Sequence, residues 1–168
     1  MNNNIIVQIS EGLGNQLFMY AHAYVLSKEL NKNLLIDNTT GYYKRKTSLR
    51  AHQKFMLNYF NILNDLAPSH FKYDTLSRDM YKKLLLFIDK FKTNKNFLIE
   101  DKKKFNEKKT VKNYSFKDIK LNKNAYIIGN YENEAYFSKF RNDLINIFDP
   151  KDNYVNSKNE IISKLKET

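Results

Sequence analysis

The feature that most constrains this chain is a short apolar segment followed at once by two glycines and a helical pattern. Residues 5–9 are apolar except for one glutamine, which is typical of a strand buried on both faces of a parallel sheet. Gly12 and Gly14 then permit a tight turn, and apolar residues at helical spacing follow. A second apolar segment, residues 34–36, ends beside Asp37. This order predicts a β-α-β unit, and hence an α/β fold with parallel strands.

Three further segments show regular patterns. Residues 78–91 form an amphipathic basic pattern, which we interpret as an ordinary helix that covers the core with its apolar face; contact with an anionic membrane surface is the alternative. That face comprises Met80, Leu84, Phe87, Ile88 and Phe91. Residues 125–129 predict a third buried strand, and residues 136–148 predict a helix after it.

Two segments lack such a pattern. Residues 42–46 predict a solvated loop, and the apolar residues after them predict contacts with the edge of the sheet. These apolar residues are Phe55, Leu57, Phe60 and Ile62. Residues 92–112 are rich in Lys and offer little to bury, so we expect a surface excursion there.

Composition narrows the functional classes. The 168 residues are one domain's length of chain, and 29 Lys+Arg against 18 Asp+Glu give a formal charge of +11. Most of these cations are Lys rather than Arg, the side chain that best reads base edges. We therefore interpret the charge as a solvated surface; a basic protein that binds RNA or an anionic membrane is the alternative. The chain has no Cys and three His, which excludes thiol catalysis and argues against a metal site. Its longest apolar run, residues 84–88, is too short to cross a bilayer, so we expect a cytoplasmic protein.

The glycine turn favours an anionic ligand. A Gly-x-Gly turn between a buried strand and a helix directs backbone N–H groups and the positive end of the helix dipole at one point, which suits a phosphate or diphosphate. Asp37 fits the acidic residue of a dinucleotide-binding fold, but Leu17 stands where that fold has its third glycine. An NAD-dependent Rossmann-type enzyme is therefore one alternative, and a tight turn without a ligand is another.

Three segments together carry a resemblance to a known enzyme family. Residues 5–21 contain Gly-Leu-Gly-Asn-Gln-Leu-Phe-Met-Tyr-Ala, residues 126–137 contain Gly-Asn-Tyr-Glu-Asn-Glu-Ala-Tyr-Phe, and residues 58–62 read Asn-Tyr-Phe-Asn-Ile. The first closely resembles the amino-terminal signature of the family 11 glycosyltransferases, the bacterial α-1,2-fucosyltransferases. The other two are similar to further segments of that family. Residues 63–124 carry no such resemblance.

The resemblance implies a fold and an activity. The fold is a Rossmann-like amino-terminal lobe, residues 1–150, of a two-lobed (GT-B-like) glycosyltransferase, with residues 151–168 starting an inter-lobe segment. The activity is transfer of L-fucose from GDP-fucose to the 2-hydroxyl of a galactose in a cell-surface glycan, as in lipopolysaccharide biosynthesis. It proceeds with inversion and needs no metal or cofactor. The implied partners are the nucleotide sugar and the glycan acceptor, without a nucleic acid. Peripheral contact with the inner face of the cytoplasmic membrane is also compatible with this activity.

The same resemblance implies site residues. Gly12, Gly14, Asn15 and Gln16 are expected to form one wall of the donor site, where backbone N–H groups and side-chain amides meet the diphosphate. The acceptor contacts and the catalytic base have weaker candidates, which are Asp37, His52, Glu132 and Glu134. His22 lies among apolar residues of the predicted helix, so we expect it in the core.

Three departures from the family pattern limit this transfer. Glu11 stands where the family has a glycine, which places a carboxylate near the expected diphosphate. Asn130 and Glu132 replace the usual Tyr and Gln. The family's His-x-Arg-Arg-Gly-Asp motif is absent from these 168 residues, and Arg is the side chain best suited to a departing diphosphate. We therefore expect a lobe whose carboxyl-terminal partner is missing, and a polypeptide with little or no activity alone.

Overall fold

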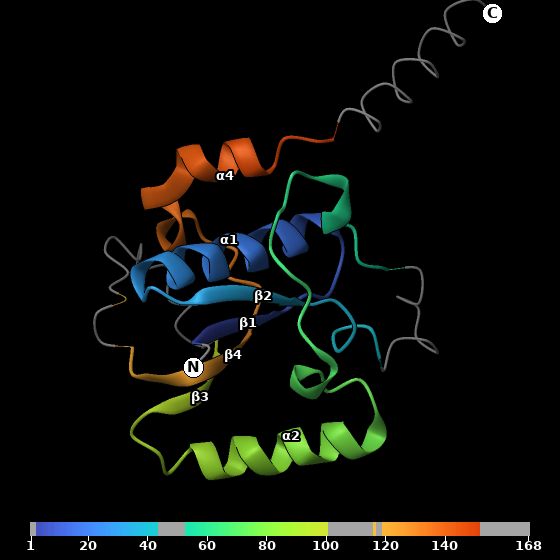
Figure 1. Ribbon diagram of the computed structural model, residues 1–168, viewed down its shortest axis with the longest axis vertical. Coiled ribbons are helices and arrows are strands. Elements are labelled where there is room, and N and C mark those ends of the chain that lie inside the picture. The colour runs from blue at the N-terminus through green and yellow to red at the C-terminus, as the bar shows by residue number, and fades with distance from the viewer. Residues whose placement is uncertain (1–2, 44–52, 101–115, 117–118, 152–168) are drawn as a thin grey trace, which may run out of the picture.

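The computed structural model describes residues 3–43, 53–100, 116 and 119–151 (Figure 1). Within them, parallel strands form one sheet in the order β2-β1-β4-β3. The strands are β1 (Asn4–Gln8), β2 (Asn33–Asp37), β3 (Lys95–Ile99) and β4 (Leu121–Ile128). The helices are α1 (Leu13–Glu29), α2 (Leu76–Asp89) and α4 (Arg141–Ile147). Short 3-10 turns lie at Leu57–Tyr59, Ser69–Phe71, Glu134–Tyr136 and Ser138–Phe140.

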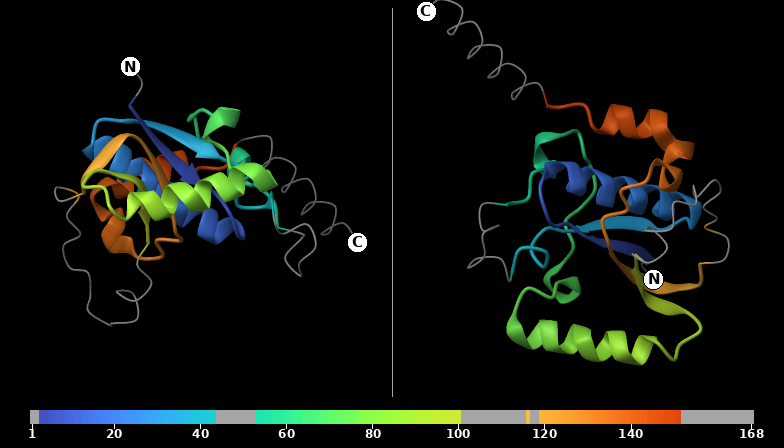
Figure 2. Two further views of the ribbon diagram at one scale, coloured as in Figure 1. Left: turned by 90° about the horizontal axis from the view of Figure 1, so that it is seen from below. Right: turned by 180° about the vertical axis from the view of Figure 1, so that it is seen from behind.

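The sheet lies between two layers of helix (Figures 1 and 2). Helix α1 covers one face of the sheet and α2 covers the opposite face, while α4 lies beyond α1. Side chains of β1 alternate between the two layers: Ile5 and Val7 belong to the core under α1, and Ile6 belongs to the smaller core under α2. Strand β1 is therefore buried on both faces, which explains its almost unbroken apolar sequence.

The main features of the predicted architecture are confirmed. The chain is an α/β protein with a parallel sheet, and its amino end has the predicted order of strand, glycine turn, helix and strand. The third buried strand is present as β4. This sheet is compatible with a Rossmann-like lobe. A second lobe remains a prediction, and residues 152–168 of the expected inter-lobe segment lie outside the described residues.

Two predictions along the second half of the chain are wrong. Lys95–Ile99 forms the edge strand β3, which pairs with β4, so residues 92–112 are not simply a surface excursion. Residues 101–112 lie outside the described part of the chain. The continuous helix expected over residues 136–148 is replaced by 3-10 turns and the short helix α4.

Helix α2 lies at the predicted place but with its predicted apolar face outward. Leu85 and Leu86 pack toward the sheet. By contrast, Met80, Leu84 and Phe87 are 61%, 54% and 58% exposed. The prediction that this face covers the core is therefore wrong.

The segment before α2 docks differently from the expectation. Leu57 is buried in the core beside α1, with Phe55 and Ile62 packed partly against the same core. The edge of β2 is instead met by Leu66, which forms a bridge with Ile36. Most of the loop predicted at residues 42–46 lies outside the described residues.

Candidate functional site

The glycine turn follows β1 at the carboxyl edge of the sheet, where open α/β folds bind their ligands. Gly12 is the N-cap residue, directly before α1, and within the described residues no side chain caps that end of the helix. The first turn of α1 contains no acidic residue. The positive end of the helix dipole is therefore not neutralised by the helix itself, which favours an anion at this turn.

The four glycines of the chain differ in what the fold requires of them. A Cβ on Gly41 would lie 2.1 Å from a backbone oxygen, and Gly129 has a φ of 151°, so both positions need glycine. Among the described residues, a Cβ on Gly12 would meet nothing closer than Nε2 of Gln53 at 4.0 Å, and a Cβ on Gly14 would meet nothing within 4 Å. Packing within that part of the chain does not explain Gly12 and Gly14, whereas close approach of a ligand to the backbone would explain both.

Glu11 occupies a backbone conformation that suits a different residue. Its φ is 66°, in the left-handed region that favours glycine. This is the position at which the resembling family has glycine. The departure at Glu11 therefore introduces backbone strain as well as a negative charge beside the turn.

Gln16 is fully buried and holds the turn in place. Its Nε2 donates to the backbone oxygens of Glu11 at 3.0 Å and Lys54 at 2.8 Å, and its Oε1 accepts from the N–H of Met56 at 2.9 Å. Donation from this amide to a phosphate would require breaking one of these bonds, so the structure gives Gln16 a positioning role. Asn15, which follows Gly14, is half-buried and makes no side-chain hydrogen bond within the described ranges.

A pocket of about 410 Å³ opens beside the turn. Its lining combines amide, hydroxyl, phenol, carboxyl and ammonium groups with one Phe, a set that suits a polar ligand. The lining residues are Asn38, Thr39, Tyr42, Tyr43, Gln53, Lys54, Phe55 and Asp74. Gln53 connects this pocket to the turn, because its Nε2 is the nearest atom to the place that a Cβ on Gly12 would take.

Asp74 is the acidic group of this pocket. Its Oδ2 accepts from Thr39 Oγ1 at 2.8 Å, and its Oδ1 accepts from Arg78 Nη1 at 3.1 Å. Burial by itself would raise the pKa of Asp74, but the hydrogen bonds from Thr39 and Arg78 outweigh it and lower the pKa. The pocket therefore holds a carboxylate that is already paired with a guanidinium.

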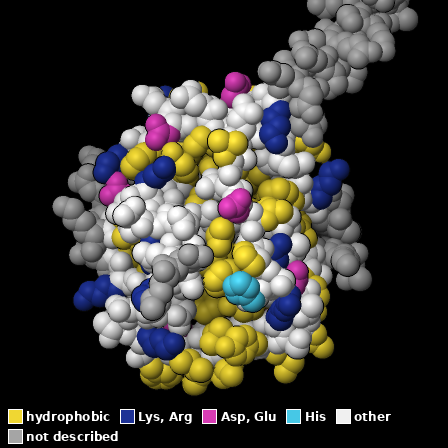
Figure 3. All heavy atoms as spheres, viewed as in Figure 1, with side chains coloured by type: hydrophobic (Ala, Val, Ile, Leu, Met, Phe, Trp, Pro, Cys, Tyr) yellow, Lys and Arg dark blue, Asp and Glu magenta, His cyan; other side chains and the backbone are white. Residues whose placement is uncertain are grey.

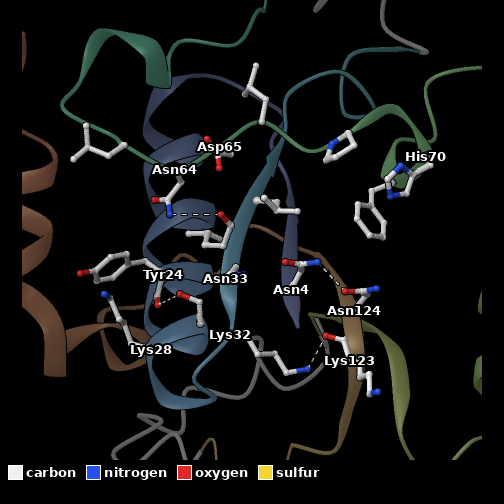
Figure 4. Close-up of a pocket in the computed structure, with 17 residues that line it drawn as sticks. Asn4, Tyr24, Lys28, Lys32, Asn33, Asn64, Asp65, His70, Lys123 and Asn124 are labelled. Carbon is white, nitrogen blue, oxygen red and sulfur yellow. Dashed lines mark hydrogen bonds between the residues drawn. The ribbon is translucent and has the colours of Figure 1, made fainter. Parts of the chain in front are cut away.

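A larger hollow of about 1130 Å³ lies at the other end of the strands (Figure 4). It is lined by the first residues of two strands, Asn4 and Asn33, by Asn124 of β4 and by Lys32 just after α1. These groups largely satisfy one another: Asn4 Nδ2 donates to Asn124 Oδ1 at 2.9 Å, and Lys32 Nζ donates to the backbone oxygens of Asn122 and Lys123. This hollow is remote from the glycine turn, so the smaller pocket is the better candidate site.

Asp37 is fully buried and organises the turn after β2. Its Oδ1 accepts from the N–H groups of Thr39 and Thr40, each at 3.0 Å, and its Oδ2 accepts from Thr40 Oγ1 and the Tyr126 hydroxyl, each at 2.5 Å. Burial and the nearby Asp37 carboxylate raise the pKa of Tyr126. Both oxygens of Asp37 are thus engaged by the protein, which argues against the dinucleotide alternative, where this residue would bind a ribose.

The other acidic candidates lie apart from Asp37. Glu132 and Glu134 are exposed on the connection between β4 and α4. Glu132 accepts from Asn130 Nδ2 at 3.0 Å, and Glu134 forms an ion pair with Arg141 at 3.5 Å. His52 lies outside the described residues. The structure therefore does not bring these candidates together in one place, and a catalytic base remains unassigned.

The turn after β4 binds an acidic residue from a distant part of the chain, Glu100, which sequence reasoning missed. The N–H groups of Asn130 and Tyr131 donate to the Glu100 carboxylate at 2.8 and 3.0 Å. An anionic ligand at this turn would have to displace that carboxylate. Nothing in the local sequence indicates the contact, because Glu100 directly follows the overlooked strand β3 and lies 30 residues from Asn130.

His22 lies in the core, as predicted. Its ring is fully buried and stacks on Tyr131 with centroids 3.6 Å apart, while Tyr136 meets it edge-on at 5.3 Å. Burial lowers the pKa of His22 to about 3. His22 is therefore a neutral core residue at physiological pH. It packs against Tyr131 and Tyr136 and does not line the candidate pocket.

The described residues form an α/β fold in which a glycine turn lies at the carboxyl edge of a parallel sheet, beside a polar pocket. Over 143 residues the chain is 33% identical to the O-antigen biosynthesis glycosyltransferase WbnK of Escherichia coli, a match that covers 82% of this chain and 45% of that protein. Over 153 residues it is 28% identical to an alpha-1,2-colitosyltransferase of Escherichia coli, covering 87% of this chain and 45% of that protein.

The chain thus spans a little less than half the length of the curated relatives it matches. These relatives are bacterial glycosyltransferases, one of them named for O-antigen biosynthesis. No protein-family model matches the chain, and a search of the solved structures found no significant match. Membership of family 11 in particular therefore remains a prediction.

Two further properties concern the described residues only. No helix among them is long and apolar enough to span a bilayer. Within the same ranges, no group of three or more His, Cys, Asp or Glu side chains is placed to hold a metal ion.

Proposed function

We propose that this chain forms the nucleotide-sugar-binding lobe of a glycosyltransferase of lipopolysaccharide O-antigen biosynthesis. The observation that carries this proposal is the pair Gly12 and Gly14. Packing among the described residues does not require glycine at either position, and both lie at a helix end that no described side chain caps. The similarity to two bacterial glycosyltransferases over more than four fifths of the chain supports it.

The finer part of the proposal is an α-1,2-fucosyltransferase reaction of the family 11 type. L-Fucose would move from GDP-fucose to the 2-hydroxyl of a galactose in a cell-surface glycan, with inversion at the anomeric carbon. The name of the second relative supports an α-1,2 linkage and makes colitose the alternative sugar. Peripheral contact with the inner face of the cytoplasmic membrane is a separate part of the proposal and does not depend on donor binding.

The chemistry assigns a limited part of the reaction to this lobe. As the sugar leaves, negative charge grows on the departing diphosphate, and donors fixed in place before the reaction lower the barrier. Here the helix end after Gly12 and the side-chain amide of Asn15 are the donors, while Gln16 holds their backbone in position. Arginines for the far side of the diphosphate are not supplied by any motif of these 168 residues.

The test uses a substitution that should increase the stability of the fold but weaken binding of the ligand. Because a Cβ on Gly14 meets no described atom within 4 Å and Ala favours a helix, Gly14→Ala should raise the free energy of unfolding by up to about 1 kcal/mol. The same methyl group should crowd a diphosphate, so the increase in melting temperature caused by GDP-fucose should fall at least by half. Thermal shift and calorimetric titration with GDP-fucose, GDP and NAD measure both effects.

Lys28→Ala is the matched control, since Lys28 is exposed at the opposite end of α1 and lines the larger hollow. This variant should respond to GDP-fucose as the wild type does. Equal responses of wild type and Gly14→Ala would reject the glycine turn as the donor site. A response to NAD without one to GDP-fucose would establish the Rossmann-type alternative instead.

A further inference from the structure

One face of helix α2 packs against the sheet. Leu85 and Leu86 pack on the core under the sheet, and Lys82 lies between helix and sheet, where its Nζ contacts Gln8 Oε1 at 3.2 Å and lies over the rings of Tyr73 and Tyr126. The opposite face of α2 points away from the sheet, as the exposure of Leu84 and Phe87 shows.

The opposite face of α2 is an apolar stripe in contact with solvent. We call it the outer stripe; it comprises Leu76, Met80, Tyr81, Leu84, Phe87, Ile88 and, just after the helix, Phe91. Exposure along it ranges from 39% at Ile88 to 79% at Phe91. Figure 3 shows hydrophobic side chains gathered along the edge of the molecule that α2 forms. An exposed patch of this kind marks an interaction surface.

Among the described residues of α2 and its carboxyl end, the exposed charges beside the outer stripe are positive. Lys90 and Lys92 are exposed there, as is Lys83, which pairs with Asp79 at 3.6 Å. The two acidic residues of α2 are turned inward, with Asp79 only 8% and Asp89 only 5% exposed. Asp89 is used within the fold, accepting from the N–H groups of Asn96 and Phe97. A partner that approaches the stripe therefore meets apolar side chains bordered by cations.

We propose that the outer stripe lies flat on an anionic lipid bilayer, with its apolar side chains between the lipid headgroups and its lysines against lipid phosphates. An apolar helix face bordered by Lys is the pattern of helices that lie in the membrane interface. The stripe runs the whole length of α2 and faces away from the sheet, while the glycine turn leads into α1 on the opposite face of the sheet. This assignment does not depend on the donor site.

The absence of Trp from the chain permits a specific probe. A Leu84→Trp variant carries a single Trp in the outer stripe, and an Ile145→Trp variant carries one at an equally exposed position of α4, since Leu84 is 54% and Ile145 55% exposed. With vesicles of phosphatidylcholine and phosphatidylglycerol, the Trp emission of the Leu84→Trp variant should shift to shorter wavelength, and that of the Ile145→Trp variant should not. Vesicles of phosphatidylcholine alone should give a much smaller shift.

Co-sedimentation with the same vesicles measures the separate contributions of apolar side chains and charges. Leu84→Asn/Phe87→Asn should reduce partition at least about tenfold, because two exposed apolar side chains no longer enter the lipid. Lys90→Gln/Lys92→Gln should reduce it about fivefold per lysine on anionic vesicles only. Leu63→Asn, at a side chain that is 95% exposed elsewhere, is the control and should leave partition unchanged.

Three outcomes would overturn the proposal. The first is equal partition of the wild type and the Leu84→Asn/Phe87→Asn variant. The second is a Trp emission of the Leu84→Trp variant that anionic vesicles leave unchanged while circular dichroism shows a folded chain. The third is self-association at physiological salt that the same double variant abolishes, without vesicle binding, which would make the stripe an interface between proteins. None of these outcomes concerns binding of GDP-fucose, so failure here is distinguishable from failure of the proposed donor site.

Discussion

Glu11 has a backbone conformation that favours glycine, yet it carries a side chain. At a φ of 66° a side chain is in steric conflict with the backbone, and glycine is not. We predict that Glu11→Gly raises the free energy of unfolding by about 1 kcal/mol. Urea denaturation at neutral pH measures the difference. Removal of the charge should also strengthen binding of GDP-fucose, measured by calorimetry.

Glu11→Ala separates the two contributions. It removes the carboxylate but keeps a Cβ at the same φ, so the gain in stability should be absent while the gain in affinity remains. Equal stabilisation by Ala and Gly would show that charge, and not backbone strain, is the source.

Residue-level predictions succeeded where the cause is local in sequence. The position of His22 among apolar residues of one helix was enough to place it in the core. The role of Gln16 was out of reach, because its partners Lys54 and Met56 are 38 and 40 residues away and belong to a segment without a regular pattern. Periodicity reports which face is apolar, not which distant backbone group a buried amide will meet.

At the scale of elements, the errors concern α2 and β3. Helix α2 has apolar residues on both faces, and the larger set is the exposed one, so periodicity selected the outer stripe as the core face. Strand β3 was overlooked because it is an edge strand in which only Phe97 is fully buried, and its flanks are rich in Lys and Asn. Both errors arise where burial comes from tertiary contacts that the sequence pattern does not encode.

Asp89 joins these two elements, and its loss should be costly. The carboxylate accepts from the N–H of Asn96 at 2.8 Å, from Asn96 Nδ2 at 2.9 Å and from the N–H of Phe97 at 3.0 Å. We predict that Asp89→Ala lowers the free energy of unfolding by about 2–3 kcal/mol, because the buried Phe97 N–H is left without an acceptor. Denaturant unfolding followed by circular dichroism measures this loss.

Asp143→Ala is the comparison for that measurement. Asp143 is exposed on α4 and accepts a hydrogen bond of 3.3 Å from the Tyr24 hydroxyl. Its replacement should change stability by less than about 0.5 kcal/mol. Similar losses at both positions would contradict a special role for Asp89 in joining α2 to β3.

For the whole molecule, His22 makes stability depend on pH. The folded chain holds this ring neutral, with a pKa of about 3, while the unfolded chain protonates it near pH 6.5. Below pH 6.5 the unfolded state therefore binds more protons, and stability falls as pH falls towards 3. Between pH 7 and pH 5 this contribution removes about 2 kcal/mol of the free energy of unfolding.

His22→Phe isolates this contribution, because the aromatic ring is kept and the titrating group is lost. The free energy of unfolding, measured at several pH values from 7 to 5, should fall less steeply in the variant than in the wild type. Parallel curves would show that the loss of stability in acid comes from other groups or from the net positive charge.

The architecture of the whole molecule was predictable in class but not in order. The opening β-α-β pattern fixes neighbouring parallel strands and one covering helix, and this was enough to predict an α/β fold. The placement of β4 between β1 and β3 was not predictable, since it requires knowledge of β3.

The Gln16 side chain is hydrogen-bonded to the backbone of Glu11 in the glycine turn and to the backbone of Lys54 and Met56. A ligand that displaces the turn would therefore also displace the chain at Lys54 and Met56. The next residue, Leu57, is anchored in the core beside α1, so this second segment has little freedom to yield. The turn and the segment at Lys54 and Met56 are thus joined through one buried side chain. If the proposed function holds, we expect this side of the pocket to keep its shape when a sugar nucleotide binds.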